Sequence, residues 1–271
     1  MTRGTTRSAD GTRLATTTWL PDGEVRGDVV LVHGVGEYLD RYEHVGQALA
    51  DAGYAVRGVD FRGHGRSEGK RGHVQRWEQY VDDLRAAIAL KSGPHAIVAH
   101  SMGTMVSLDH LRDAETWGYV GSATTIVVGV KAPAWKLYGA RLLSRIAPSL
   151  SQSNEIPIEH ICSDVAVQEA YLADPLVFST ITPRWFIEMK AAQERIKTAA
   201  PKYTMPAYIP YGEQDEIISI DALLDFSRRF GGEITLVPYA GMRHEVFNEP
   251  DNATVLRGVI DWLDTHNPAS P

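Results

Sequence analysis

A short apolar strand that passes into a helix through a single serine constrains this chain more than any other feature. Residues 96–99 (AIVA) are apolar, Ser101 follows them, and a helix pattern begins at Met102. A serine in such a strand-to-helix turn sits at a cramped backbone position, where the small residues Ala99 and Gly103 let strand and helix pass closely. The stretch therefore predicts that Ser101 is a nucleophile.

A second serine matches the usual sequence pattern of this turn more literally. Residues 65–69 read GRSEG, which fits Gly-x-Ser-x-Gly, whereas the stretch around Ser101 reads AHSMG. GRSEG lies in a polar, glycine-rich run with no helix pattern after it, and this context is typical of a loop. We therefore predict that Ser101, and not Ser67, is the nucleophile.

The order of apolar runs and helix patterns predicts an α/β protein with a mostly parallel sheet. Continuous apolar runs such as 28–32 (DVVLV) suit strands that are buried on both faces, and they alternate with helix patterns along the chain. The Thr-rich segment 12–20 and the turn residues at 21–24 predict an opening hairpin. Further strands are expected at 54–60, 96–99, 124–129, 207–212 and 234–238, and helices at 42–53, 77–90, 219–230 and 252–266.

The strand pattern stops between residues 130 and 203. This segment contains only helix-like stretches, at 134–146, 164–171 and 183–198, separated by proline and serine. We therefore expect a core domain of residues 1–129 and 204–271, with residues 130–203 inserted after the sixth strand as a helical cap. Its apolar side chains are expected either to wall the site or, more simply, to form the cap's own core; they are Trp135, Leu137, Leu142, Ile158, Phe178, Trp185 and Ile187.

Composition excludes several other functions. The net charge of -7 over 271 residues, without a basic run, argues against a nucleic-acid partner. The N-terminal residues lack the apolar core of a signal peptide, and no stretch approaches the roughly twenty apolar residues of a membrane span, so a cytoplasmic location is expected.

Cys162 is the only cysteine and the ten histidines show no ligand spacing, so we expect no metal and no cofactor. An exposed apolar cap leaves open a transient contact with a lipid surface or with a second subunit.

A serine nucleophile needs a base, and the base needs an acid that fixes its tautomer. In this class of fold the acid and then the histidine follow the serine, each after a strand. Asp215 comes just after the expected strand 207–212, and His244 lies in the loop before the last helix. The simpler alternatives are that Asp215 caps a helix and that His244 lies on the surface. His100, next to Ser101, is expected to point away and to pack.

The negative charge that develops on a reacting carbonyl oxygen needs two backbone donors. The amide of Met102 is one candidate, because it lies at a helix N-terminus. The second is expected from residues 33–37 (HGVGE), where glycines bring the amide of Val35 inward. The alternative for this segment is an ordinary glycine turn.

Several linked motifs resemble the monoacylglycerol lipase and lysophospholipase branch of the α/β-hydrolases. They are HGVGE, RYEHVGQAL, VDFRGHGRSEGKRGHV, WEQYVDDL, AHSMG, YGEQDEIISI and GMRHEVFNEP, with DVAVQEAYLADPLV in the cap. The resemblance implies the α/β-hydrolase fold, a catalytic triad of Ser101, Asp215 and His244, and oxyanion amides at Val35 and Met102.

The resemblance also suggests which residues contact the substrate. In the family, the Glu and Arg of the HGxGE segment lie near the polar head of the monoglyceride, which points to Glu37 and Arg41; a surface pair at i,i+4 is the alternative. His33 and Gly34 of the same segment are expected at the substrate site. Where the family usually has GHSMGG, this chain has Ala99 and Thr104.

The leading hypothesis is a serine ester hydrolase that cleaves a monoacylglycerol to fatty acid and glycerol through an acyl-enzyme. An esterase for other small alkyl or aromatic monoesters would use the same residues. A non-catalytic relative that binds a small ligand is the third possibility, although no triad residue is missing. Dehalogenase and epoxide hydrolase chemistry is disfavoured, because those relatives have an aspartate in place of Ser101.

Overall fold

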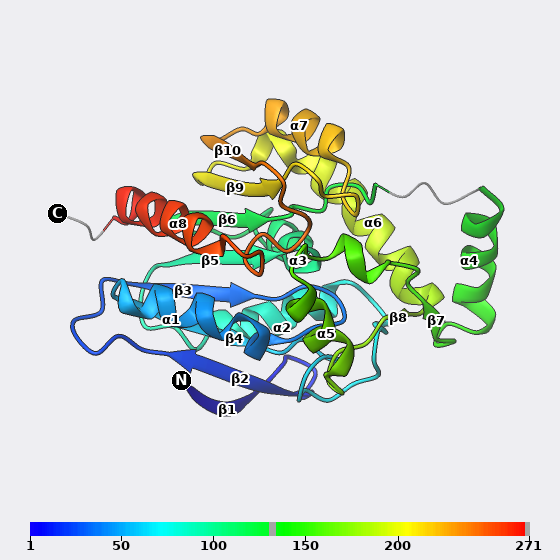
Figure 1. The fold of residues 1–271 in the computed structure, drawn as a ribbon. Helices are drawn as coiled ribbons and strands as arrows, with labels where there is room; N and C mark the ends of the chain where they lie inside the picture. The colour runs from blue at the N-terminus through cyan, green and yellow to red at the C-terminus, as the bar shows by residue number, and fades with distance from the viewer. Residues whose placement is uncertain (130–133, 269–271) are drawn as a thin grey trace.

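A mostly parallel sheet forms the centre of the molecule. The computed structural model describes residues 1–129 and 134–268, except for the side chains of 134–137. Eight strands lie in the order β1-β2-β4-β3-β5-β6-β9-β10, from β1 at the bottom to β10 at the top of Figure 1. β2 pairs antiparallel with both β1 and β4, and the other neighbours are parallel. The strands are β1 (Thr2–Arg7), β2 (Arg13–Trp19), β3 (Gly27–Val32), β4 (Tyr54–Val59), β5 (His95–His100), β6 (Gly118–Ser122), β9 (Ala207–Gly212) and β10 (Ile234–Tyr239).

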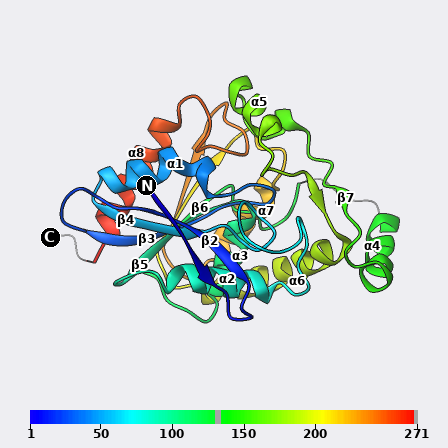
Figure 2. The same ribbon diagram turned by 90° about the horizontal axis from the view of Figure 1, so that it is seen from below.

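Helices cover both faces of the sheet (Figures 1 and 2). On one face, α1 and α8 pack apolar side chains such as Leu49 and Val259 against β3 and β5. On the other face, α2, α3 and α6 supply residues such as Leu84, Val106 and Ile196 to a second core. The central strands are thus buried on both sides, which explains their continuous apolar runs. The helices are α1 (Glu43–Asp51), α2 (Glu78–Ile88), α3 (Met102–His110), α7 (Ile220–Arg229) and α8 (Asn252–His266), with 3₁₀ turns η1 (Leu39–Tyr42) and η3 (Ala200–Lys202).

The segment between β6 and β9 is mainly helical. Asp164 and Thr182 accept hydrogen bonds from backbone amides at the starts of α5 and α6, which fixes where these helices begin. α4 stands at the right-hand margin of Figure 1, away from the sheet. The segment contains α4 (Ala134–Ile146), η2 (Ile158–His160), α5 (Val165–Ala173) and α6 (Pro183–Ala199), together with the paired two-residue strands β7 (Gln152–Ser153) and β8 (Thr180–Ile181), which the sequence did not predict.

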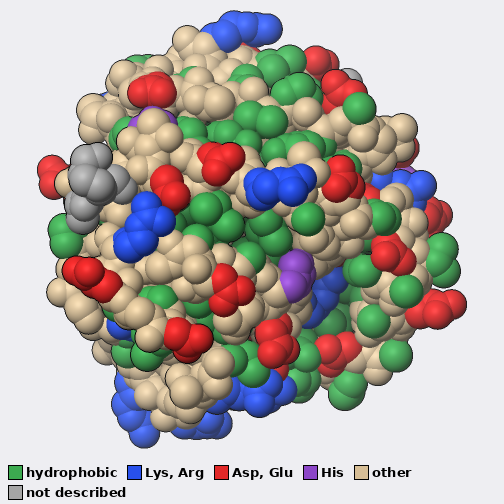
Figure 3. Space-filling model, turned by 60° about the vertical axis from the view of Figure 1, so that its left-hand side comes forward, with side chains coloured by type: hydrophobic (Ala, Val, Ile, Leu, Met, Phe, Trp, Pro, Cys, Tyr) green, Lys and Arg blue, Asp and Glu red, His purple; other side chains and the backbone are tan. Residues whose placement is uncertain are grey.

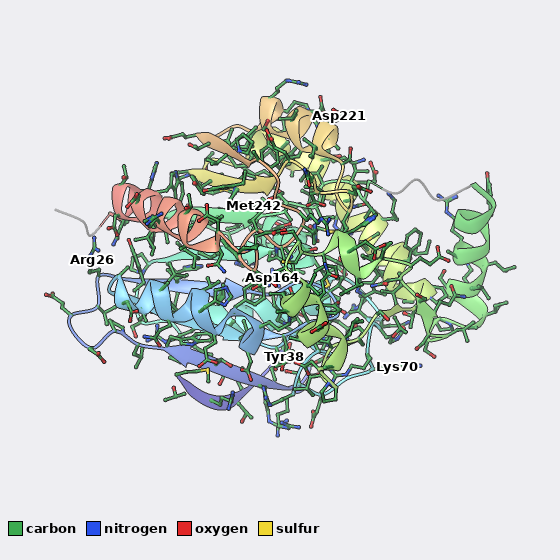
Figure 4. All side chains as sticks on the ribbon, viewed as in Figure 1. Arg26, Tyr38, Lys70, Asp164, Asp221 and Met242 are labelled. Atoms are coloured by element: carbon green, nitrogen blue, oxygen red, sulfur yellow. The ribbon has the colours of Figure 1, made fainter. Side chains whose placement is uncertain are left out.

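Polar contacts connect this segment to the loops of the sheet. The hydroxyl of Tyr38 donates to Asp174 at 2.6 Å, and the ammonium of Lys70 donates to the carbonyl of Ser149 at 2.6 Å. Tyr38 and Lys70 lie beside the segment in Figure 4. The segment is therefore held against the sheet from several positions.

The apolar residues of this segment have different surroundings. Trp185 is buried in the core that α2, α3 and α6 form on the sheet, where the centroid of its ring lies 6.2 Å from that of Trp77. Ile158 packs in a small cluster with the fully buried Cys162. Leu142, by contrast, is 60% exposed. The side chains of Trp135 and Leu137 lie outside the described residues.

The opening hairpin differs from the prediction. β1 and β2 form it around Asp10 and Gly11, and β2 then pairs with β4 instead of β3. Residues 21–24 only lead from β2 to β3. The amide of Gly11 donates to the carbonyl of Ser8 at 2.9 Å, and Gly11 has a φ of 86°, so the turn runs from Ser8 to a glycine in the left-handed conformation.

The prediction of a strand at 124–129 was also wrong. The sixth strand is β6, and residues 124–129 form a turn with only an isolated bridge between Val128 and Ile218. Ala123 has a φ of 48°, and the hydroxyl of Thr124 donates to the carbonyl of Gly121 at 2.8 Å. These local bonds compete with strand pairing, although the residues are β-branched.

Candidate active site

The loops that carry the predicted site residues meet at one edge of the sheet. β3 and β5 are parallel neighbours with Val32 opposite Ala99, and β9 and β10 are parallel neighbours with Gly212 opposite Tyr239. Parallel strands end at the same edge, and ligands of open α/β sheets bind beyond these carboxyl ends. The loops after β3, β5, β9 and β10 are thus placed for one common site.

Ser101 occupies a strained turn between β5 and α3. Its φ of 49° and ψ of −118° are unusual for a residue with a side chain, and such conformations cost about 1–3 kcal/mol. A Cβ on Gly103 would lie 2.6 Å from the carbonyl oxygen of His33, so α3 crosses β3 at a distance that only glycine permits. The turn therefore presents the serine side chain beyond the end of β5.

Three predicted residues form a continuous row of hydrogen bonds. His244 Nε2 lies 2.8 Å from Ser101 Oγ, and His244 Nδ1 lies 2.8 Å from Asp215 Oδ2. Asp215 Oδ1 accepts from the amides of Ile217 and Ile218. Because a carboxylate only accepts, His244 carries its proton on Nδ1 and leaves Nε2 open to the serine hydroxyl. This arrangement can remove the Ser101 proton.

The charges of the row support this direction of transfer. Burial alone would lower the pKa of His244, but the charge and hydrogen bond of Asp215 outweigh it and raise that pKa. Burial would raise the pKa of Asp215, yet His244 and the two amides lower it. Asp215 is therefore ionised at neutral pH and stabilises a protonated His244.

The start of α3 and the loop after β3 both lie next to the turn of Ser101. Met102 is the first residue of α3, where a helix leaves its amides without intrahelical acceptors. On the loop after β3, a Cβ on Gly34 would lie 3.2 Å from Ser101 Cβ, so the backbone of the residue before Val35 lies beside the turn. The roles of the Met102 and Val35 amides as oxyanion donors stay a prediction.

The structure gives His33 a different environment from the predicted substrate site. Its Nε2 accepts from the amide of Phe61 at 2.9 Å, and its Nδ1 donates to the carbonyl of Gly34 at 2.7 Å. Burial lowers the pKa of this histidine well below its usual value. Both ring nitrogens are bonded to the backbone, so His33 braces the loop and presents no nitrogen to a substrate.

Glu37 and Arg41 are buried and bonded to protein groups. They form the i,i+4 pair that the sequence allowed, but in the interior and not on the surface. Arg41 also donates two hydrogen bonds to Glu245, at 2.8 and 2.7 Å. The sequence reasoning missed Glu245, whose only signal was its position directly after His244.

The residues that replace the family's glycines pack without reaching into the site. Ala99 is fully buried in β5. The hydroxyl of Thr104 donates to the carbonyl of Ser101 at 2.6 Å and accepts from the amide of Thr125 at 3.1 Å. Since both bonds are to backbone, Thr104 fixes the first turn of α3. His100, as expected, is buried, and its ring packs edge-on against His244.

Ser67 is bonded as a structural residue. Its hydroxyl donates to the carbonyl of Asp60 at 2.5 Å and accepts from the amide of Ala15 at 2.9 Å. We expect Ser67→Ala to keep ester hydrolysis within about twofold of wild type and to lower the free energy of unfolding by about 1–2 kcal/mol, because two partly buried backbone groups lose their hydrogen bonds. Steady-state kinetics and urea unfolding measure both effects. A large loss of turnover in a folded Ser67→Ala protein would contradict the assignment of Ser101.

The described residues show no group of three or more His, Cys, Asp or Glu side chains arranged to hold a metal ion. Acidic and basic side chains are interspersed over the middle of the face that Figure 3 shows, and basic side chains gather along its lower edge.

The parallel sheet and the serine at a strained strand-to-helix turn define the class of α/β-hydrolases. Residues 23–251 match the family model described as serine aminopeptidase, S33. The chain belongs to this family of serine hydrolases, in its monoacylglycerol lipase branch.

Relatives span almost the whole chain. A monoacylglycerol lipase of Mycolicibacterium smegmatis is 30% identical, covering 94% of this chain and 94% of its own length. The phospholipase YtpA of Bacillus subtilis is 24% identical over 92% of this chain and 99% of its own. The crystal structure of a monoacylglycerol lipase of Paleococcus ferrophilus superposes with a TM-score of 0.87 at 27% identity, covering 93% of this chain and 99% of that one.

Proposed function

We propose that this serine hydrolase cleaves monoacylglycerols to a fatty acid and glycerol through an acyl-enzyme on Ser101. The observation that carries the proposal is the hydrogen-bonded row from Asp215 through His244 to Ser101 Oγ. The names of the Mycolicibacterium and Paleococcus relatives support the choice of substrate.

The proposed reaction proceeds in two halves. Ser101 Oγ attacks the ester carbonyl carbon while His244 Nε2 takes its proton, and the charge on the carbonyl oxygen is stabilised by the amides of Val35 and Met102. The bond to the alcohol oxygen then breaks, and His244 returns the proton to glycerol. A water attacks the acyl-enzyme by the same route, which releases the fatty acid and restores Ser101.

A substrate panel tests this proposal. It compares monoacylglycerols of several chain lengths with diacylglycerols, a lysophospholipid, and simple alkyl and aromatic esters, using kcat/KM as the measure. The highest kcat/KM is expected for a monoacylglycerol. A clear preference for non-glyceride esters would instead support the alternative function, an esterase for other small monoesters. No hydrolysis of any ester would favour a ligand-binding relative.

We further propose that residues 130–203 act as a cap over a core of residues 1–129 and 204–271, and that α4 contacts lipid. Apolar side chains recur every fourth residue on its outer side: Tyr138, Leu142 and Ile146 are 69, 60 and 69% exposed. Arg141 lies over the ring of Tyr138, so the row carries positive charge beside it. A helix of this kind suits the surface of an anionic bilayer. The described chain contains no helix long and apolar enough to cross a membrane, and the cytoplasmic location expected from the sequence stays a prediction.

The double variant Leu142→Glu/Ile146→Glu tests the lipid contact. We expect it to reduce hydrolysis of a monoacylglycerol in anionic vesicles by about tenfold or more, because two exposed apolar side chains lose their burial in lipid. Hydrolysis of a short, soluble monoester is expected to stay at the wild-type rate. Leu20→Glu, at a leucine that is 55% exposed just after β2, is the control. Equal rates on vesicles for both variants would contradict the contact.

A further inference from the structure

Two buried carboxylates share one arginine next to the proposed catalytic residues. Glu37 Oε2 accepts from Arg41 Nη1 at 2.5 Å, and Glu245 accepts from both terminal nitrogens of Arg41. The three side chains are 3, 11 and 5% exposed, in the order Glu37, Arg41 and Glu245. We refer to Glu37, Arg41 and Glu245 as the ion triad. Charges this deeply buried must keep their partners, so the ion triad has one favoured geometry.

One end of the ion triad holds the loop after β3. Glu37 Oε1 accepts from the amide of Gly34 at 2.6 Å and from the hydroxyl of Tyr42 at 2.6 Å. Gly34 lies so close to the turn of Ser101 that a Cβ on it would be 3.2 Å from Ser101 Cβ, and it precedes Val35, the proposed oxyanion donor. A shift of the Glu37 carboxylate would therefore move this donor relative to the nucleophile.

The other end holds the loop after β10. Glu245 directly follows His244, and its side chain also accepts from Asn248 Nδ2 at 2.7 Å. Its own amide donates to the carbonyl of Ile161 at 2.8 Å, in the inserted helical segment. The ring of Tyr171, from the same segment, lies 4.7 Å from the guanidinium carbon of Arg41. The ion triad thus connects the loop of the base with the loop of the oxyanion donor, and both with the inserted segment.

Resting on the proposed function, we infer that the ion triad is a positioning unit that keeps His244 and the Val35 amide aligned on Ser101. Glu245 is its central new member. It acts through His244 and Arg41 without touching the substrate. This role replaces the predicted contact of Glu37 and Arg41 with the head of the monoglyceride.

The ion triad also sets the electrostatic surroundings of His244. With two carboxylates and one guanidinium it carries a net negative charge when fully ionised, which favours a protonated imidazole. After Asp215, Glu245 and then Glu37 contribute most to raising the pKa of His244 against the effect of burial. The groups that face His244 are Asp215, Glu245, Glu37, Arg41 with the opposite charge, and His100, whose pKa burial lowers to about 3.

The variant Glu245→Gln keeps the size of the side chain and removes its charge. We expect kcat on a soluble monoester to fall about tenfold, because alignment of the base is weakened, with KM within about twofold of wild type. The acid limb of the pH profile of kcat/KM is expected to move to lower pH, since a less negative environment lowers the pKa of His244. Glu213→Gln removes an exposed carboxylate two residues from Asp215 and is the matched control, with wild-type kcat and acid limb.

A second variant separates charge from alignment. Glu245→Asp keeps the charge but shortens the side chain, so the acid limb should stay near the wild-type pH while kcat falls. If Glu245→Gln does not fold, the kcat of Glu245→Asp is the test. A wild-type kcat in Glu245→Asp would then overturn the inference. A loss of kcat in Glu245→Gln with an unmoved acid limb would also overturn it, because that result describes a merely structural residue. If wild type hydrolyses no ester, the proposed function fails; an active wild type with unaffected Glu245 variants rejects only the positioning role.

Discussion

Ser101→Ala is expected to reduce ester hydrolysis by roughly 10⁴- to 10⁶-fold while the protein stays folded. The Oγ atom is the only group of the hydrogen-bonded row that would bond to the acyl carbon, and alanine removes it. The remaining amides of Val35 and Met102 still polarise a carbonyl, so a small residual rate is expected. Progress curves with a soluble monoester at high enzyme concentration measure this loss.

The strained backbone at Ser101 provides a control for folding. Alanine keeps the strain of the positive φ, so Ser101→Ala should unfold at nearly the wild-type denaturant concentration. Glycine adopts this conformation freely, and Ser101→Gly should therefore be more stable than Ser101→Ala by about 1 kcal/mol. Both variants should be equally inactive. Wild-type turnover in either one would contradict the role of Ser101.

The second large effect is expected for Asp215→Asn, with a loss of about 10⁴-fold in kcat. Asp215 Oδ1 accepts from the amides of Ile217 and Ile218, so the oxygen of an asparagine would take that place and its NH₂ group would face His244. His244 Nδ1 would then have to accept, and the proton would move to Nε2. An Nε2 that carries a proton cannot take another from Ser101.

Asp221→Asn is the matched control for this variant. Asp221 is exposed in the first turn of α7, at the top of Figure 4, and is six residues further along the chain from Asp215. Its substitution should leave kcat within about twofold of wild type. Equal activity of Asp215→Asn and Asp221→Asn would show that His244 needs no acid partner.

The sequence was sufficient to predict those site residues whose positions follow from the neighbouring strands and helices in the chain. The strand and helix around Ser101 identified the turn, and the positions of Asp215 and His244 after strands brought them together, because parallel strands end at one edge. Gly103 was predicted to let strand and helix pass closely. The structure has this close approach, because a Cβ on Gly103 would lie 2.6 Å from the carbonyl oxygen of His33.

The sequence was insufficient where contacts join distant positions. Glu245 and Arg41 are 204 positions apart, so their pairing has no local pattern. The sequence predicted Glu37 as a surface or substrate-binding carboxylate. In the structure it is buried and accepts hydrogen bonds from Gly34, Arg41 and Tyr42. At 124–129 the apolar, β-branched composition predicted a strand, but the backbone at Ala123 turns the chain away from the sheet.

The most direct test of the account is to label the folded protein with a serine-directed fluorophosphonate and to locate the adduct by peptide mass spectrometry. We expect one adduct per chain, on Ser101, with loss of ester hydrolysis in proportion to labelling, and no adduct on the Ser101→Ala protein. An adduct on Ser67 would contradict the assignment of Ser101. Loss of hydrolysis on treatment with the reagent, without an adduct on Ser101, would contradict it too.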